Sequence, residues 1–536
     1  MTRAASEIGA GLAPARPARP IHPGEHVHVV GAAGAGASAA ALLAAGVGAM
    51  VTACDPGAPS PYTAALEAVG IAVAPAHDPA HVATEAGPAV DRLAVSKALT
   101  SVAPDHPELA AARAHGIPLE AWQQLVADAA MTAHQTLVGV TGTHGKSTST
   151  GWLLHVLAEA GRDPSGFVGA LMEPRAPGEP ASTARIGRGD LCVVEADEYA
   201  ANFDPYHASI AVLLNAEWDH PDVFADEAAV LDAFEGWVRA MVPDGSGAPP
   251  TLVVNVADAG AAMVATRLAD WPGTLVRVAL SAGDGHTDGS PAEDGSPADE
   301  PRATAGLDLS ARLVVTGTGT DILEIEGPLL TGQFGAKPPF RVRLPLVGRH
   351  NAANALCVAA AAAVLGLRGP IIASGVESFH GVGRRLEVKG EPGGVLVLDD
   401  YGHHPSAIEA TLAAVRARHS GRPIWAVYEP LTFHRTAAML DAFADVLATA
   451  DHAVIADIWA GRDPDRTITS AAELAAAITA RSATPALATG SPEATADRLA
   501  DLVRPGDVVL VMGGGRSYVI AARLVERLRE RMVQKG

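Results

Sequence analysis

The chain has 536 residues, of which 18% are charged and 48% are apolar, and its formal net charge at pH 7 is −21. This length is too great for one hydrophobic core and indicates about three domains. Binding a polyanion requires a basic face, and the sequence has no cluster of Lys and Arg. We therefore expect neither a nucleic-acid partner nor an anionic membrane partner.

The cysteines, Cys54, Cys192 and Cys357, lie far apart and include no Cys-x-x-Cys pair. This pattern predicts neither a disulfide framework nor a zinc ribbon, and it is typical of a reducing compartment. The amino terminus has no continuous apolar segment of the signal-peptide type, and no run elsewhere reaches membrane-spanning length without polar interruption. We expect a cytoplasmic protein that is a monomer or a homodimer.

The amino-terminal part of the chain predicts a loose arm followed by a nucleotide-binding unit. Residues 1–25 are rich in Ala, Pro and Arg, and we expect them to form a flexible arm. Residues 26–30 predict a strand, and a glycine-rich loop, a helix over 39–45 and a second strand over 50–55 follow. This order is typical of a Rossmann-like unit, in which Asp55 stands where such folds place a carboxylate against a sugar or base.

The next region contains the most informative motif. An apolar run at 136–140 precedes Gly142-Thr143-His144-Gly145-Lys146-Ser147-Thr148, and an amphipathic segment follows from residue 152. A glycine-rich turn between a strand and a helix directs backbone N–H groups toward a phosphate, while the lysine adds a charge and the serine a hydroxyl for Mg²⁺. The motif lacks the outer glycine of a standard Walker A loop, because Val140 occupies that position. It predicts a bound nucleoside triphosphate, and a chance glycine loop is the alternative.

Polar residues follow two further strands of this region. Glu195-Ala196-Asp197-Glu198 comes after the strand at 191–194, and the polar stretch 215–220, ending in His220, comes after the strand at 210–214. The carboxyl ends of parallel strands meet at one sheet edge, so these groups favour a Mg²⁺ site beside the phosphate loop. A solvated acidic turn is the alternative. Residues 281–305 are acidic and lack large apolar side chains, and they predict a disordered insertion.

After residue 381, strands expected at 395–400, 423–428, 453–458 and 508–512 alternate with helices expected at 407–417 and 437–447. Such alternation predicts another open parallel sheet. The predicted fold class is therefore α/β, with three consecutive Rossmann-like or P-loop-like domains and mostly parallel sheets. The expected domains span residues 26–132, 133–380 and 381–536.

These motifs resemble those of the Mur ligase family, the ATP-dependent amide-forming enzymes of peptidoglycan assembly, over nearly the whole chain from residue 26. The phosphate loop has the ligase form, and the clusters at 195–198 and 215–220 resemble the metal-binding pair of the family. The resemblance implies catalytic roles for Lys146, Glu195 and His220, and Mg²⁺ ligation by Ser147, Glu195 and His220. It implies ATP contacts from Gly142, Thr143, His144, Gly145, Lys146, Ser147, Thr148, His350, Asn351, Asn354 and Arg385.

The resemblance also implies the substrates. Residues 399–405 closely match the alanine-adding branch, so the expected reaction joins the carboxylate of UDP-N-acetylmuramate to an amino acid, with L-alanine favoured, through an acyl phosphate. The first domain would bind the UDP-sugar, and the third would bind the amino acid and close on ATP. The substrate-binding residues expected on this basis are Gly34, Gly36, Ser38, Asp55, Ser96, His403, His404 and Arg435.

Some positions depart from the family motifs. Ala33 and Ala37 replace Gly and Met in the first glycine loop, Leu431 replaces His in a third-domain motif, and Arg516 replaces Asp near the end of the chain. Residues 195–199 with 218–220 also favour the related branch that attaches a recycled tripeptide. Two alternatives therefore remain at this point: the tripeptide-attaching ligase, and a non-catalytic homologue that binds nucleotide.

Overall fold

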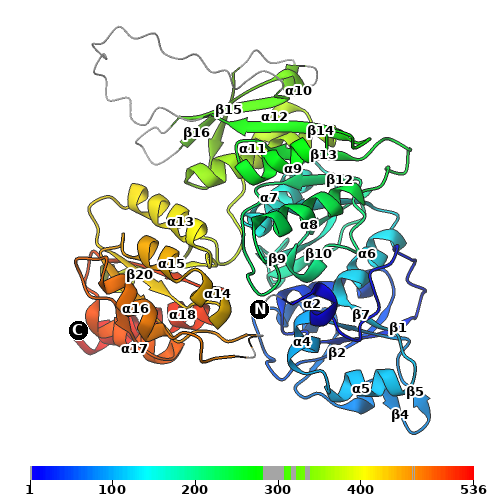
Figure 1. Cartoon of the computed structure of the whole chain (residues 1–536), viewed down its shortest axis with the longest axis horizontal. Coiled ribbons are helices and arrows are strands. Elements are labelled where there is room, and N and C mark those ends of the chain that lie inside the picture. The colour runs from blue at the N-terminus through cyan, green and yellow to red at the C-terminus, as the bar shows by residue number, and fades with distance from the viewer. Residues whose placement is uncertain are drawn as a thin grey trace.

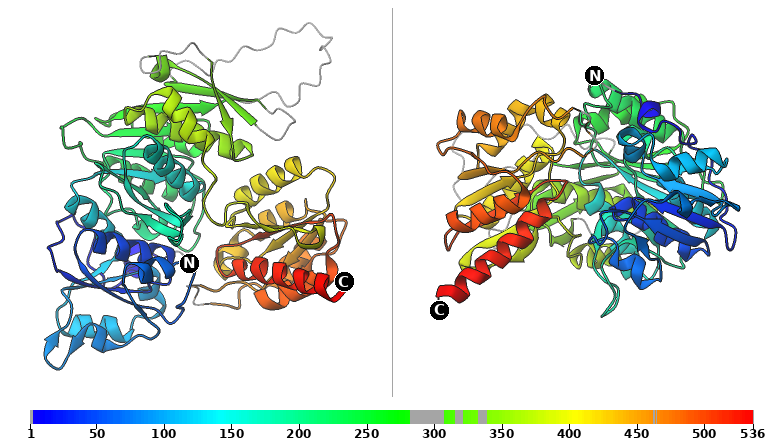
Figure 2. Two further views of the ribbon diagram at one scale, coloured as in Figure 1. Left: turned by 180° about the vertical axis from the view of Figure 1, so that it is seen from behind. Right: turned by 90° about the horizontal axis from the view of Figure 1, so that it is seen from below.

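The computed structural model describes residues 3–281, 307–314, 321–331, 339–461, 463 and 465–535. Three α/β regions follow one another along the chain, and the first and third lie side by side against the middle one (Figures 1 and 2). Apart from Ser281, the predicted acidic insertion at 281–305 lies outside the described residues. Among the helices of the described residues, none is both long and apolar enough to cross a bilayer.

The first region contains a wholly parallel sheet in the order β3-β2-β1-β6-β7, with a separate antiparallel pair formed by β4 and β5. Its strands are β1 (His26–Val30), β2 (Met50–Cys54), β3 (Val73–Ala74), β4 (Ala83–Thr84), β5 (Gly87–Pro88), β6 (Arg92–Val95) and β7 (Leu119–Ala121). Its helices are α1 (Ala5–Ile8), α2 (Ala35–Gly46), α3 (Ala64–Ala68), the 3₁₀ turn η1 (Pro79–His81), α4 (Lys97–Val102), α5 (Pro107–Ala114) and α6 (Trp122–Thr132).

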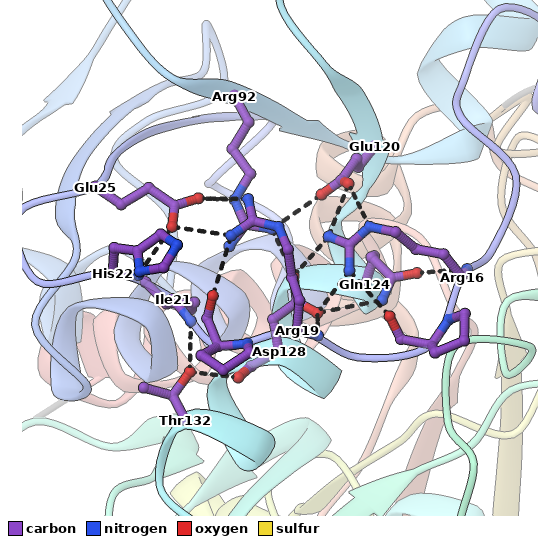
Figure 3. A network of polar contacts seen from close by, with 12 residues as sticks. Arg16, Arg19, Ile21, His22, Glu25, Arg92, Glu120, Gln124, Asp128 and Thr132 are labelled. Carbon is purple, nitrogen blue, oxygen red and sulfur yellow. Dashed lines mark hydrogen bonds and ion pairs between the residues drawn. The ribbon is translucent and has the colours of Figure 1, made fainter.

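The segment that precedes β1 is anchored to this region by ion pairs. Arg16 Nη2 lies 2.8 Å from both Glu120 Oε1 and Asp128 Oδ2, and Asp128 is fully buried. The buried guanidinium of Arg92 reaches the same two carboxylates from the other side (Figure 3). The structure therefore differs from the expected loose arm over residues 1–25, because two buried carboxylates need the cation that the arm supplies. The arm is also held before Arg16, since Ile8 is fully buried and the Ala13 amide donates to Leu119 O at 2.7 Å.

The middle region contains a ten-stranded sheet in the order β10-β9-β11-β8-β12-β13-β14-β15-β16-β17. The strands from β9 to β15 in this order are parallel, whereas β10, β16 and β17 pair antiparallel with their neighbours. The strands are β8 (Thr136–Thr141), β9 (Ser165–Met172), β10 (Ser182–Arg185), β11 (Leu191–Glu195), β12 (Ile210–Leu213), β13 (Thr251–Asn255), β14 (Thr274–Leu280), β15 (Leu309–Val314), β16 (Asp321–Glu326) and β17 (Phe340–Leu344). The helices are α7 (Lys146–Glu159), η2 (Tyr199–Ala201), α8 (Glu227–Arg239), α9 (Ala259–Arg267), α10 (Pro328–Thr331), α11 (Arg349–Val364) and α12 (Gly369–Glu377).

The strand order places the predicted polar clusters beside the phosphate loop. Strand β8, which leads into the loop, lies between β11 and β12. Their register pairs Glu195 with Val140 and Leu213 with Thr141, so both neighbouring strands end level with the start of the loop. The polar residues that follow β11 and β12 therefore flank the amino end of α7.

The third region contains a six-stranded sheet in the order β18-β19-β23-β20-β21-β22, parallel except for β18. Its strands are β18 (Glu387–Gly390), β19 (Leu396–Asp400), β20 (Ile424–Tyr428), β21 (His452–Ile455), β22 (Leu487–Ala488) and β23 (Val508–Met512). Its helices are η3 (Pro392–Gly394), α13 (Pro405–Arg418), α14 (Phe433–Ala438), α15 (Leu440–Leu447), α16 (Ala471–Thr479), α17 (Pro492–Leu502) and α18 (Ser517–Lys535). The single helix expected at 437–447 is two helices here, which meet at Met439.

The first and middle regions share one hydrophobic core. Helix α2 packs against β9 and β10 of the middle sheet as well as against α6, and the buried apolar residues of both regions form one continuous cluster. The third sheet instead has separate cores on its two faces, and from the middle region Trp218 packs against one of them. The first two regions are thus one packed unit, while the third makes a smaller contact with it.

Candidate active site

A cleft of about 1080 Å³ lies where the three regions meet. The phosphate loop from Thr143 to Thr148 and the starts of α11 and α13 open onto it. The predicted site residues that line it are Gly36, Ser96, Thr143, His144, Gly145, Lys146, Ser147, Thr148, Glu195, His220, His350, Asn351, Asn354, Arg385, His403 and His404. The predicted residues outside its lining are Gly34, Ser38, Asp55, Gly142 and Arg435.

The phosphate loop presents an uncapped helix end to this cleft. Gly145, with φ of 79°, is the N-cap of α7, and no side chain caps that helix. A Cβ atom on Gly145 would lie 2.9 Å from the amide of Asn354, so only glycine allows this approach. The first N–H groups of α7 have no helical partner and point outward, which is the arrangement that binds an anion.

Lys146 is a permanent cation at this helix end. Its Nζ donates a hydrogen bond to Gly142 O at 2.7 Å and lies 2.9 Å from Glu198 Oε2. Burial lowers the pKa of the Lys146 ammonium, but the negative charges of Glu198 and Asp197 outweigh burial and raise that pKa above its ordinary value. Lys146 therefore keeps its positive charge beside the position where phosphate would bind.

Two carboxylates, those of the half-buried Glu195 and the buried Glu198, lie beside Lys146, and each has a different neighbour. Glu195 accepts hydrogen bonds from Ser147 Oγ at 3.0 Å and from the Gly169 amide at 2.6 Å. Burial raises the pKa of Glu198 to about 7, although Lys146 opposes the shift. Glu198 Oε1 has no hydrogen-bond partner among the described residues, and it lies 3.8 Å from His220 Nε2.

This set of side chains fits a hard divalent cation. Ligand atoms of Asp197, Glu198 and His220 lie within 4.8 Å of one another. An unpartnered, buried carboxylate oxygen is costly unless a cation or a donor meets it, and Mg²⁺ prefers oxygen ligands. The sequence paired Glu195 with His220, whereas in the structure the carboxylate beside His220 is that of Glu198 and the one beside Ser147 is that of Glu195.

The loop that carries His220 is fixed from the third region. Arg435 Nη2 lies 2.7 Å from Asp219 Oδ1 and 3.1 Å from His220 Nδ1, and Arg435 is only 3% exposed. Burial would raise the pKa of Asp219, but Arg435 and His220 hold it well below its usual range. In this structure the Arg435 side chain is buried against His220 and positions it, and its expected substrate contact stays a prediction.

A second contact between the regions involves His144, which the sequence assigned to ATP. Its ring packs against that of His404 with centroids 4.5 Å apart, and its Nε2 lies 3.5 Å from Glu217 Oε2. The same Glu217 oxygen accepts a hydrogen bond from Ser406 Oγ at 2.7 Å. Burial, together with the nearby His144, lowers the pKa of His404 to about 4, so His404 is neutral at pH 7.

Arg385, which is expected to contact ATP, and its neighbour Arg384 point to different places. Arg385 Nη2 donates a hydrogen bond to Ser147 Oγ at 3.2 Å, at the phosphate loop. Arg384 donates to Gly513 O at 2.7 Å and lies 3.3 Å from Asp399 within the third region. Arg385 is thus the arginine that reaches the phosphate-loop end of the cleft.

Two predicted substrate residues of the first region, Ser38 and Asp55, contact other parts of the protein and lie outside the cleft lining. Ser38 is fully buried and hydrogen-bonds to Thr183 Oγ1 of β10 at 3.0 Å, so it lies between the first and middle regions, and its expected substrate contact stays a prediction. Both carboxylate oxygens of Asp55 accept backbone amides, from Ala33 at 2.9 Å and Gly57 at 2.7 Å. Through its hydrogen bond with the Ala33 amide, Asp55 fixes the backbone conformation of the glycine loop.

The other first-region residues lie at helix starts. Gly34 is the N-cap of α2, and Ser96 caps α4 by accepting the Ala98 amide at 3.2 Å. A Cβ atom on Gly36 would collide with the ring of Trp122, which also lines the cleft. Because Gly36 has no Cβ atom, the Trp122 ring can pack directly against the backbone of the glycine loop.

Sequence reasoning missed some cleft residues. Lys97 Nζ donates to Ala200 O and Ala201 O, both at 2.8 Å, and so joins the first region to the loop after β11. The ring of Tyr401 lies 5.1 Å from the Arg385 guanidinium, at a distance suitable for a cation–π contact. No sequence spacing marks Lys97, whereas Tyr401 stands inside the motif at 399–405 and could have been singled out there.

Family models match the chain in three consecutive segments. Residues 26–134 match the Mur ligase family, catalytic domain, residues 140–298 match the Mur ligase middle domain, and residues 384–515 match the Mur ligase, glutamate ligase domain. The chain belongs to the Mur ligase family. The predicted family and the predicted α/β fold class with mostly parallel sheets are both confirmed.

Individual Mur ligases resemble the chain over almost its full length. The UDP-N-acetylmuramate–L-alanine ligase of Frankia casuarinae is 35% identical over 527 residues, covering 94% of this chain and 98% of that protein. The crystal structure of the UDP-N-acetylmuramate-alanine ligase MurC from Thermotoga maritima has a TM-score of 0.71 at 21% identity, and covers 94% of this chain and 99% of its own. The murein peptide ligase of Psychrobacter arcticus has a TM-score of 0.66, also at 21% identity and with the same coverage. Both structures show the fold.

Proposed function

We propose that this Mur ligase uses ATP to join the carboxylate of UDP-N-acetylmuramate to L-alanine in peptidoglycan biosynthesis. The observation that carries the proposal is the single cleft that holds Lys146, Glu195 and His220 at the meeting point of three regions. The 35% identity to a ligase named for this reaction supports the choice of substrates.

The reaction needs an activated acid, because a carboxylate has no good leaving group. Transfer of the γ-phosphoryl group of ATP to the carboxylate oxygen gives an acyl phosphate and ADP. The amine nitrogen then attacks the carbonyl carbon, the C–O bond to phosphate breaks, and the nitrogen loses a proton. Both steps develop negative charge on phosphate oxygens, so the protein must supply fixed positive charge and N–H donors.

The chain supplies these groups from two regions. Lys146 and the first amides of α7 lie at the phosphate loop, and Arg385 reaches the same place from the third region. Because the fixed donors are already in position, little reorganisation is needed when charge develops. Glu195, Glu198, Ser147 and His220 would hold Mg²⁺, which when bound neutralises phosphate charge.

We assign His403 to the amine. Its Nδ1 donates to Tyr401 O at 2.9 Å, which leaves Nε2 as the acceptor nitrogen of a neutral ring. Burial, reinforced by Arg435, lowers the pKa of His403 well below its ordinary value, so His403 is too weak a base to deprotonate an ammonium group. Its role is to orient the neutral amine by accepting a hydrogen bond. In contrast, His404 uses both ring nitrogens, toward Trp218 O and the Ser406 amide.

The direct test is phosphate release from ATP with UDP-N-acetylmuramate and a panel of amines, in the presence and absence of Mg²⁺. We expect L-alanine to be consumed and Mg²⁺ to be required. Preference for the tripeptide L-alanyl-γ-D-glutamyl-meso-diaminopimelate would move the assignment to the murein peptide ligase branch. Nucleotide binding without substrate-dependent phosphate release would indicate the non-catalytic homologue. The cytoplasmic location and the monomeric or homodimeric state stay predictions.

A further inference from the structure

A cluster of metal-binding side chains lies in the first region, outside the lining of the cleft. It joins elements that are separated in the sequence: β1, the end of β2, the turn η1 and the start of α5. We call it the histidine cluster, and its members are His28, Cys54, His77, His81, His106 and Glu108.

The ligand atoms of four members converge on one point. Cys54 Sγ lies 3.3 Å from His28 Nε2 and 3.1 Å from Glu108 Oε1, and that carboxylate oxygen lies 3.4 Å from His28 Nε2 and 2.7 Å from His81 Nδ1. All four ligand atoms lie within 4.8 Å of one another. Ligands at about 2.0–2.3 Å from a tetrahedral zinc ion are separated from each other by roughly 3.3–3.8 Å. Most of the observed separations are close to that range.

The centre of the histidine cluster is closed to solvent. His28 is 1% exposed, and Cys54 and Glu108 are fully buried. The other ring nitrogen of His28 lies 2.8 Å from Thr52 Oγ1. Metal-binding histidines commonly use the second nitrogen in this way, because the hydrogen bond fixes the orientation and tautomer of the ring.

The protein atoms alone leave this cluster unsatisfied. His106 is 6% exposed, and neither of its ring nitrogens has a hydrogen-bond partner among the described residues. Its Nδ1 lies 3.9 Å from Glu108 Oε2, and the His77 Nδ1 lies 3.2 Å from the same oxygen. An imidazole always carries at least one N–H, and a buried donor without a partner destabilises the folded state. If an ion is bound by one oxygen of Glu108, the other oxygen can turn toward His77 and His106. That would reduce the cost of the unpartnered ring nitrogens of His106.

We propose that His28, Cys54, His81 and Glu108 bind a structural Zn²⁺ ion, with His77 and His106 packed against the carboxylate from outside. A thiolate and two imidazoles suit zinc, whereas Mg²⁺ prefers oxygen ligands alone. The charges also balance, since one thiolate and one carboxylate neutralise a divalent cation in a buried site. Four protein ligands leave no open position, so the ion holds β1, β2, η1 and α5 together and takes no part in the ligase reaction.

The test measures zinc in the full chain, purified without a metal-affinity step and dialysed against metal-free buffer. We expect stoichiometric zinc by mass spectrometry in the wild type. Cys54→Ala should lose it, while Cys357→Ala, which also removes a buried free thiol, should keep it. Replacement by Co²⁺ should give a thiolate-to-cobalt charge-transfer band in the wild type and in Cys357→Ala but not in Cys54→Ala.

Measurements on the wild type test the proposed zinc site even if Cys54→Ala does not fold. A strong chelator should lower its melting temperature, and added Zn²⁺ should restore it. His81→Ala removes a half-buried ligand and should weaken zinc retention with less disturbance of the core. Absence of zinc after purification, together with no binding on titration with Zn²⁺ or Co²⁺, would overturn the proposal, as would unchanged zinc content in Cys54→Ala.

Discussion

Arg385 donates a hydrogen bond from Nη2 to Ser147 Oγ, 3.2 Å away and 238 positions earlier in the chain. It is a direct link between the third region and the phosphate loop. Ser147 in turn donates to Glu195, so one hydrogen-bonded chain runs from the third region to a proposed Mg²⁺ ligand. The position of the third region is therefore coupled to the geometry of the nucleotide site.

Arg385→Ala should impair the reaction more than it impairs folding. The variant loses a cation that faces the phosphate loop, and we expect kcat/KM for phosphate release to fall by about 10²–10³-fold. Arg188→Ala is the control, because Arg188 is almost fully exposed and lies 4.0 Å from its nearest carboxylate. Similar rates for the two variants would contradict the proposed role of Arg385.

Lys146→Met should abolish most of the phosphate release that depends on UDP-N-acetylmuramate. The substitution keeps much of the side-chain volume but removes the charge beside the amides of α7, and the expected loss is at least about 10²-fold. Circular dichroism and a thermal melt check that the fold is intact. Substantial retained activity would remove Lys146 from the mechanism.

Gly169→Ala should raise the Mg²⁺ concentration that the enzyme needs. A Cβ atom on Gly169 would lie 2.9 Å from Glu195 Oε1, so the carboxylate must move although the backbone need not. Displacing a group that orients a metal ligand typically weakens metal affinity by about 10- to 100-fold. Gly236→Ala in α8 is the matched control, because no heavy atom lies within 4 Å of a Cβ there. An unchanged Mg²⁺ dependence would argue against Glu195 as a ligand.

Arg92→Met should strongly destabilise the first region. Arg92 is 1% exposed and pairs with Glu25, Glu120 and Asp128, which would be left as buried carboxylates with fewer cations (Figure 3). Removing one partner of a buried ion pair costs about 3–5 kcal/mol in free energy of unfolding. The exposed Arg188→Met should change that free energy by at most about 0.5 kcal/mol. If urea denaturation gave the same free energy of unfolding for Arg92→Met and Arg188→Met, the structural role of Arg92 would be disproved.

The same network predicts a pH dependence. Burial would raise the pKa of Glu25, but hydrogen bonds from Arg19 and the His22 amide, together with the charge of Arg92, lower it from 4.5 to about 2. In that window the unfolded chain binds a proton that the folded chain does not, so the free energy of unfolding falls as the pH falls. Glu25→Gln should be less stable at neutral pH and should lose less stability on acidification. Identical slopes for the two proteins between about pH 5 and about pH 2 would exclude this contribution.

The sequence predicted the features that depend on consecutive residues. The phosphate loop and the strands that precede Glu195 and His220 follow from local patterns, and parallel topology brings their ends together. The burial of Ser38 and Arg435 could not be predicted, because it depends on packing against another region. The histidine cluster escaped notice because its members, from residue 28 to residue 108, share no metal-binding spacing.

The continuous core beneath α2, β9 and β10 has a mechanical consequence. Because moving α2 away from the middle sheet would expose apolar surface, we expect the first two regions to move together as one rigid body. Opening for product release is then left to the third region, which residues 378–386, between α12 and β18, connect to the middle region. A compound that binds between the third region and the first two regions would therefore inhibit the enzyme without resembling ATP.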